Sequence, residues 1–178
     1  MRRFIIDRRI ARTRVQVHWS VAVAFPFAWA LADNLLLGAV GFVCFLVLLV
    51  VHEVGHAVAA RSFGLDVRGI EIFPFHGQCH FELPSHRLDH YLIAWAGVLA
   101  QTSLLLIFVA VYAVAAYLPV AINHFLAPFI FVFVWLNILI LLLNVLPVPG
   151  LDGYYAWRLV PAIFNGQLVR QIRGRRGR

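Results

Sequence analysis

Long apolar stretches without charge dominate the pattern of residues along this chain. A helix that crosses the hydrocarbon core of a bilayer needs roughly 20 predominantly apolar residues. Extended by their neighbours, the three longest stretches predict membrane-spanning helices over about 35–62, 88–118 and 125–146. The stretches that carry no acidic or basic side chain are residues 35–51, 91–122 and 125–151.

A further apolar segment, about 17–31, predicts a first membrane span ahead of these three. Asp33 and Asn34 follow it, and either residue type can cap the next helix. Pro147 ends the last span because proline has no amide hydrogen and clashes with the preceding turn. A short helix over about 151–164 and a basic tail, 165–178, complete the chain. We therefore expect a single membrane-embedded domain over 1–178, all-α and polytopic, with four transmembrane helices.

One connection, residues 65–83, is long enough to have structure of its own. Its apolar residues roughly alternate with polar ones on either side of His76 and Gly77. Such alternation, interrupted by a turn, predicts a small β-hairpin, which we expect at the cytoplasmic end of the helices.

Composition agrees with a lipid environment. The chain is 62% hydrophobic and 13% charged, with a mean hydropathy of +0.85. Soluble domains average about 45–50% apolar and about 25% charged residues. The stretch after the first arginines has no clear cleavage site, so we expect it to be retained. Cys44 and Cys79 are expected to be free thiols, because one lies in an apolar span and the other in a loop.

The positive charges predict how the chain is oriented. All 15 basic side chains are arginines, and most lie near the two ends. Four spans with a cytoplasmic N-terminus leave no arginine on the outer side, as the positive-inside rule requires. We therefore predict a multi-pass protein of the cell (plasma) membrane whose termini and active-site opening are cytoplasmic. The arginines flank hydrophobic spans, so nucleic acid is not an expected partner.

Three ionisable residues, His52, Glu53 and His56, stand inside the second predicted span. They form the pattern HExxH. Successive residues of a helix are rotated by about 100°, so the two imidazoles share one face and the carboxylate lies within reach of the same point. This arrangement suits two ligands of a zinc ion and a base for its water. Such groups in an apolar helix are costly, which makes them functional candidates.

Asp152 is the best candidate for a third metal ligand. It follows Pro147, Val148, Pro149 and Gly150, and counting helical rise places it at about the depth of His52. Non-helical backbone at membrane depth is tolerated where it is buried in protein or lines a watery cavity, so this loop predicts a cavity. The alternative for Asp152 is an acidic residue that favours the start of the last helix.

HEVGH on one predicted transmembrane helix, followed about a hundred residues later by NVLPVPGLDG, resembles the site-2 protease family of intramembrane zinc metalloproteases. The resemblance covers roughly residues 35–164 and is to a minimal form without a PDZ or CBS domain. It implies a three-helix core, with zinc between the second and fourth predicted spans. It also implies that His52, His56 and Asp152 are zinc ligands and that Glu53 is the catalytic base.

The same resemblance implies residues that position the substrate. Asn144 matches the asparagine of the family motif, and Pro147 and Pro149 match its prolines. The middle core helix of the family typically carries Gly-Pro-x-x-Asn, whereas here Gly97 is followed by valine and the asparagine is replaced by Gln101. Gln101 can hydrogen-bond a substrate or make a polar contact between helices.

The implied activity is hydrolysis of peptide bonds in or near the transmembrane segments of single-pass membrane proteins, as in regulated intramembrane proteolysis. The expected partners are such a substrate, the lipid bilayer and a regulatory membrane protein. The hairpin over 65–83 is expected to capture the unwound substrate by strand addition. Two other functions stay open from the residues alone: a transmembrane metal transporter and a catalytically inactive metal-binding scaffold.

Overall fold

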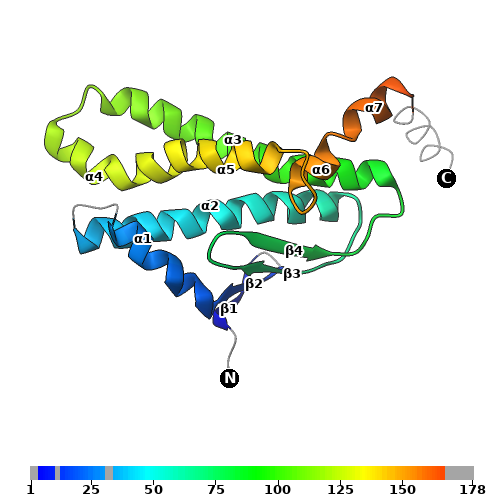
Figure 1. Cartoon of the computed structure of the whole chain (residues 1–178), viewed down its shortest axis with the longest axis horizontal. Coiled ribbons are helices and arrows are strands. Elements are labelled where there is room, and N and C mark those ends of the chain that lie inside the picture. The colour runs from blue at the N-terminus through cyan, green and yellow to red at the C-terminus, as the bar shows by residue number, and fades with distance from the viewer. Residues whose placement is uncertain (1–3, 11–12, 31–33, 167–178) are drawn as a thin grey trace.

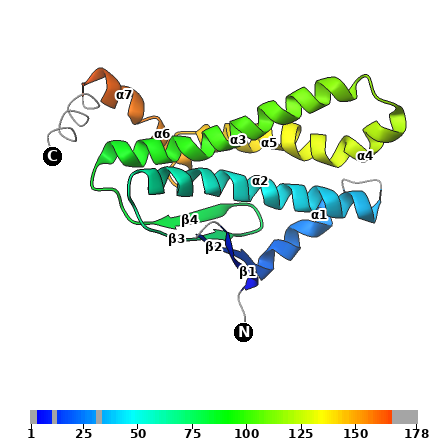
Figure 2. The ribbon, with the colours of Figure 1, turned by 180° about the vertical axis from the view of Figure 1, so that it is seen from behind.

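The computed structural model describes residues 4–10, 13–30 and 34–166. Helix α2 (Leu35–Ser62) lies in the middle of the molecule, between a small sheet on one side and a pair of long helical segments on the other (Figures 1 and 2). One member of that pair is α3 (Arg87–Ala115). The other contains α4 (Val120–Ile130) and α5 (Asn137–Val145). The second half of α2 is therefore covered on both sides.

Helix α2 begins and ends where the sequence predicts. The Asn34 side chain accepts a hydrogen bond from the backbone N–H of Leu37 at 2.9 Å, which satisfies a donor that has no partner within the helix. Gly64, just beyond the helix, has a φ of +79°, the left-handed conformation that glycine adopts without steric cost. With 28 residues and a rise of about 1.5 Å per residue, α2 is about 42 Å long.

Three helices in the described part of the chain are long and apolar enough to cross a membrane. They span Leu35–Ser62, Arg87–Ala115 and Ile122–Val145. These correspond to the second, third and fourth predicted spans. The third ends at Ala115, three residues earlier than predicted, shortly before Pro119.

The last of these crossings is not a regular α-helix. Between α4 and α5 lies a π-helix, η2 (Phe131–Leu136), and Pro128 precedes it inside α4. Proline removes an amide donor and its ring displaces the carbonyl of the preceding turn, so the regular hydrogen-bond ladder is interrupted here. Such π-turns are frequent at functional sites. The crossing ends at Val145, as Pro147 predicts.

The prediction of a single helix over 17–31 is wrong at its start. Val17 and His18 belong to strand β2 (Thr13–His18), and the helical part begins with a 3-10 helix, η1 (Trp19–Ala24), followed by α1 (Phe25–Ala30). Residues 31–33 lie outside the described residues. These 12 helical residues extend roughly 21 Å, less than the roughly 30 Å of a hydrocarbon core. The segment is not one of the three candidate spans.

The predicted hairpin exists but is half of a larger sheet. Strands β3 (Val67–Ile72) and β4 (Gly77–Phe81) pair antiparallel, and the order across the sheet is β1-β2-β3-β4. Strand β1 (Phe4–Ile10) pairs antiparallel with β2, and β2 pairs parallel with β3. The all-α prediction missed β1 and β2, because β2 finds its neighbour about fifty residues away in the sequence.

The sheet is held against α2 by its apolar face. In β2, Val15 and Val17 are buried while the intervening Gln16 is less so, which is the alternation of a half-buried strand. They lie beside Ile70 and Ile72 of β3, in one hydrophobic cluster with Leu49, Ala57 and Ala60 of α2. This packing fixes β4 along the second half of α2, where His52, Glu53 and His56 stand.

The predicted C-terminal helix over 151–164 is two short helices, α6 (Asp152–Ala156) and α7 (Leu159–Phe164). Pro161 explains the break, since proline is tolerated in the first turn of a helix but would clash in the middle of a continuous one. The basic tail from residue 167 onward lies outside the described residues.

Candidate metal centre

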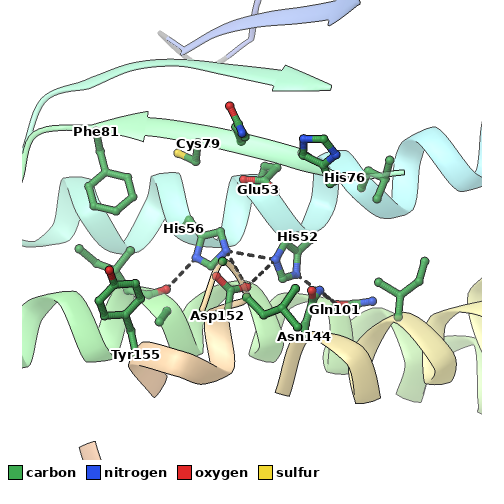
Figure 3. A pocket seen from close by; sticks show the side chains of 18 of the residues that line it. His52, Glu53, His56, His76, Cys79, Phe81, Gln101, Asn144, Asp152 and Tyr155 are labelled. Atoms are coloured by element: carbon green, nitrogen blue, oxygen red, sulfur yellow. Dashed lines mark hydrogen bonds and ion pairs between the residues drawn. The ribbon is translucent and has the colours of Figure 1, made fainter. Parts of the chain in front are cut away.

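His52 and His56 of α2 point to the same side of the helix, toward α3 and α6 (Figure 3). Both are buried, with 8% and 6% of their surface exposed. Their Nε2 atoms lie 3.1 Å apart. As predicted, the spacing of four residues on the helix brings the two ring nitrogens to one point.

Asp152 reaches the same point from the other end of the chain. As the first residue of α6 it places Oδ2 at 2.8 Å from Nε2 of His52 and 3.2 Å from Nε2 of His56. Two indole groups fix this short helix. Trp157 donates to the carbonyl of Val145 at 2.7 Å, and Trp95 of α3 donates to the carbonyl of Ala156 at 2.9 Å.

The other nitrogen of each imidazole has an acceptor. Nδ1 of His52 lies 3.1 Å from Oε1 of Gln101, and Nδ1 of His56 lies 2.8 Å from the backbone carbonyl of Ile93. A carbonyl oxygen can only accept, so in both rings Nδ1 carries the proton and donates it. Neutral imidazoles in this tautomer present an unprotonated Nε2.

This donor set fits a zinc ion. Two unprotonated imidazole nitrogens and a carboxylate oxygen converge, and the three ligand atoms lie within 4.8 Å of one another. Tetrahedral zinc with bonds of about 2.0–2.1 Å would set its ligand atoms about 3.3 Å apart. The measured separations of 2.8, 3.1 and 3.2 Å are close to that value. Three acceptor atoms facing one another repel unless a cation lies between them.

The charge of Asp152 suits this role. Burial raises the pKa of its carboxyl group, but the neighbouring imidazoles of His52 and His56 outweigh burial and hold that pKa below its ordinary range. Asp152 is therefore anionic at neutral pH.

Glu53 stands beside the three convergent groups and is not one of them. It is 5% exposed and lies between α2 and β4, where the backbone amide of Cys79 hydrogen-bonds its carboxyl group (Figure 3). This position gives Glu53 one side toward the sheet and one toward the cavity that the metal centre shares. An acid or base at this place can exchange a proton with a molecule bound in the cavity.

The cavity has a volume of about 690 Å³ and is partly open. It lies between α2, β4, α3 and the loop before α6. His52, Glu53, His56 and Asp152 line it, so the predicted ligands and the predicted base share one space. Other lining residues come from β4, α3, α5 and α6, and include Cys79, Phe81, His90, Gln101, Asn144 and Tyr155.

Three of the residues predicted to position substrate lie close to the imidazoles. Asn144 is half-buried and lines the cavity, and its Nδ2 donates to Oε1 of Gln101 at 3.4 Å. Gln101 is fully buried against His52. Gly97 lies against both rings: a Cβ atom there would overlap the ring of His56 and come within 3.0 Å of Cε1 of His52. Their roles toward substrate stay predictions.

Pro147 and Pro149 are placed differently. Both are exposed, and the cavity is lined instead by the end of their loop, Gly150 and Leu151. The two prolines keep the loop out of a helical conformation, and the loop delivers Asp152 to the imidazoles. The predicted cavity at this loop is present, whereas contact between the prolines and a substrate stays a prediction.

Three residues near the centre were missed by the sequence reasoning. Gly77 and Cys79 of β4 lie over Glu53, and the sequence gives no signal for this because it depends on how the sheet docks. Asn137 is fully buried beside Gln101. A signal for Asn137 was present, since it is a polar residue in an apolar span, seven residues before Asn144 and so on the same helical face.

Comparisons with known proteins agree with this geometry. The chain is 35% identical over 176 residues to Rip3 of Mycobacterium tuberculosis, whose name proposes it as a zinc metalloprotease. It is 28% identical over 150 residues to stage IV sporulation protein FB of Bacillus subtilis. These matches cover 84% and 82% of this chain but 43% and 48% of the relatives, so the chain spans less than half of their length. No protein-family model matches.

Among solved structures, the fold is similar to that of the site-2 protease from Methanocaldococcus jannaschii. The TM-score is 0.63 at 19% sequence identity, over 88% of this chain and 71% of that one. At such low identity this match establishes the fold alone. Three observations point to a membrane protein with a metal site: the three apolar helices, the zinc metalloprotease relative and the cluster of His52, His56 and Asp152. The chain is an integral membrane protein that has the fold of a site-2 protease and is similar in sequence to a relative named as a zinc metalloprotease.

Proposed function

We propose that this chain is an intramembrane zinc metalloprotease, which hydrolyses peptide bonds in or near the transmembrane segments of single-pass membrane proteins. One observation carries the proposal. His52, His56 and Asp152 bring three ligand atoms together at the wall of a cavity, and Glu53 lines the same cavity. Metal binding alone does not require a buried carboxyl group next to the ligands, whereas hydrolysis does.

In this proposal the three clustered side chains hold zinc, and Glu53 is the general base. When bound, zinc supplies Lewis-acid chemistry, since it acidifies water and polarises a carbonyl group. Glu53 accepts a proton from the attacking water and then donates it to the leaving amine. The amide of Cys79 holds the carboxyl group of Glu53 in place between the two transfers.

Asn144 is proposed to stabilise the negative charge that develops on the substrate carbonyl. It lines the cavity, and its Nδ2 carries two hydrogens, of which one is directed at Gln101. The second is available to an oxyanion. Donors that are already oriented stabilise such charge at little cost in reorganisation.

The substrate is proposed to bind as an extended segment along β4. This strand is the last in the sheet order and lines the cavity, and apart from the amide of Cys79, which bonds Glu53, its outer edge pairs with no other strand in the described part of the chain. A transmembrane helix hides its carbonyl groups in its own hydrogen bonds, so it must unwind before cleavage. Strand addition to β4 would stabilise the unwound form through backbone hydrogen bonds. A regulatory membrane protein is the proposed partner that delivers the substrate.

We further propose four membrane spans in the plasma membrane, with both termini and the cavity opening cytoplasmic. The first of these is the segment over about 17–31, in which the structure describes helical residues from Trp19 to Ala30. Strands β1 and β2 lie in the same sheet as β3, at one side of the membrane helices. This arrangement keeps their arginines on the same side as those of the connection between α2 and α3.

The test compares the purified chain with its Glu53→Gln variant on a panel of single-pass membrane proteins in detergent or lipid. We expect cleavage by the wild type, none by the variant, and an equal zinc content in both. A chelator is expected to abolish cleavage and added zinc to restore it. Cleavage that persists in the variant would exclude Glu53 as the base. A wild type that holds zinc and cleaves no member of the panel would favour a scaffold or a transporter.

A further inference from the structure

Gln101 of α3 and Asn137 of α5 form a reciprocal pair of hydrogen bonds between two membrane helices, which we call the clasp. Nδ2 of Asn137 donates to the backbone carbonyl of Gln101 at 3.2 Å, and Nε2 of Gln101 donates to the backbone carbonyl of Asn137 at 3.5 Å. Nδ2 of Asn137 also donates to the carbonyl of Phe133 at 3.2 Å. Both side chains are fully buried. Each side-chain amide therefore bonds the backbone of the other residue, which fixes the two helices at this depth.

The clasp orients the amide of Gln101. Because Nε2 is directed at the Asn137 carbonyl, Oε1 must face the other way, toward His52 and Asn144. There it accepts from Nδ1 of His52 at 3.1 Å and from Nδ2 of Asn144 at 3.4 Å. A carbonyl oxygen has two lone pairs, and both are used by these donors. No acceptor capacity is left on Gln101 for a substrate amide.

We propose that Gln101 is the positioning residue of the metal ligand His52 and that Asn137 holds Gln101 in the orientation this requires. Gln101 accepts a hydrogen bond from the Nδ1–H group of His52 and thereby keeps Nε2 of His52 unprotonated and aimed at Asp152. Asn137 acts at one remove: its backbone carbonyl accepts from Nε2 of Gln101, and its side chain bonds the Gln101 backbone and so holds the two helices together. This inference rests on the proposed zinc site and not on which bond the protein cleaves. It replaces the substrate-binding role predicted for Gln101.

The chemistry of metal sites supports such a chain of contacts. A ligating imidazole generally donates its second N–H to a carboxylate, a carbonyl or water, and loss of that partner typically lowers metal affinity by about 10–100-fold. His56 uses a backbone carbonyl for this purpose, which mutation cannot remove. His52 depends on a side chain, so its orientation is open to test by substitution.

The experiment measures zinc affinity of the purified chain by competition with a chelator, which needs no substrate. We expect Gln101→Met, which has similar volume and no acceptor, to lower the affinity about 10–100-fold. Gln101→Asn is one methylene shorter and cannot reach Nδ1 from the same backbone position, so it is expected to lose a similar amount. Gln101→Glu retains the acceptor and loses the donor to the Asn137 carbonyl, and it is expected to bind zinc more tightly than Gln101→Met and Gln101→Asn.

Asn137→Leu is expected to lower the affinity by a smaller factor than Gln101→Met, because it removes the bond from the Asn137 side chain to the Gln101 backbone and keeps the Asn137 carbonyl that accepts from Nε2 of Gln101. Ser103→Ala is the matched control, since Ser103 is a polar residue of the same helix that bonds only within that helix, to the Leu99 carbonyl. It is expected to bind zinc like the wild type.

Cobalt substitution separates positioning from packing. With cobalt in place of zinc, the visible absorption of Gln101→Met is expected to differ from that of the wild type and of Gln101→Glu, because the geometry of His52 changes. A packing role would lower the melting temperature of Gln101→Met and leave affinity and spectrum unchanged. If Gln101→Met does not fold, the pair Gln101→Asn and Gln101→Glu decides. Equal zinc affinities in that pair would overturn the proposal, whether or not the wild type is found to be a protease.

Discussion

Gly77, the first residue of β4, lies directly against the carboxyl group of Glu53. A Cβ atom at position 77 would come within 2.5 Å of Oε1 and 2.7 Å of Cδ of Glu53, closer than van der Waals contact allows. The sheet therefore approaches the proposed base at a point where only a residue without a side chain fits. This contact links the docking of the sheet to the placement of the base.

We expect Gly77→Ala to impair catalysis while leaving the metal site intact. The added methyl group displaces the end of the Glu53 side chain, which is the flexible partner in the contact, and leaves His52 and His56 where they are. The turnover number is expected to fall at least about tenfold, since a displacement of about 1 Å can cost that much or more. Zinc affinity is expected to stay unchanged.

The control for Gly77→Ala is Gly41→Ala, the same substitution in α2 at a site where the new Cβ meets only Pro128 at 3.8 Å. It is expected to leave turnover and zinc affinity as they are. A Gly77→Ala variant with full turnover would show that Glu53 tolerates displacement or acts from another position.

Gly97→Ala is expected to weaken zinc binding, unlike Gly77→Ala, which is expected to impair turnover alone. The new Cβ would overlap the ring of His56 and crowd that of His52, and both rings are tied by their Nδ1 atoms to partners on α3 itself. Zinc affinity measured by chelator competition is therefore expected to fall by at least about tenfold, by analogy with the loss of a ligand's orienting contact. Activity is expected to recover in part when excess zinc is added. An unchanged affinity would mean that α2 and α3 can separate without cost.

Asp152 is expected to be necessary for metal retention. Asp152→Ala removes the only anionic member of the cluster, and zinc content after dialysis against a weak chelator is expected to fall to a small fraction of the wild-type value. Asp66→Asn, an exposed acidic position on the connection before β3, serves as the control and is expected to retain zinc. Full zinc content in Asp152→Ala would contradict the assignment of Asp152 as a ligand.

The thiol of Cys79 is expected to be inert near neutral pH. Burial and the neighbouring Glu53 raise its pKa to about 12 from an ordinary value of 9.0. Because the thiolate is the reactive form, its population at pH 8 is about a thousandfold smaller than in the unfolded chain. Alkylation by iodoacetamide, followed on the Cys79 peptide by mass spectrometry, is expected to be slower in the native protein by at least that factor. Equal native and unfolded rates would mean that the thiol is neither buried nor perturbed.

Much of the architecture follows from local features of the sequence. Apolar length determines the three long spans, Asn34 and Gly64 determine the bounds of α2, and Pro147 ends the last crossing, because each effect acts within a few residues. The pattern HExxH is local as well, since four residues on a helix fix the separation of two side chains. Asp152 could be predicted as the third ligand from its depth in the membrane, because helical rise converts residue counts into position across the membrane.

The contacts between elements could be learned only from the tertiary structure. The strand over residues 13–18 is a strand because β3 pairs with it, and parallel pairing between segments that far apart leaves no local signal. The contact of Gly77 with Glu53 and the clasp of Gln101 with Asn137 exist because the sheet and α5 dock against opposite sides of α2 and α3. The sequence by itself determined which groups could hold a metal ion, and packing decided how each group is oriented, because hydrogen-bond partners from distant segments meet only in the folded chain.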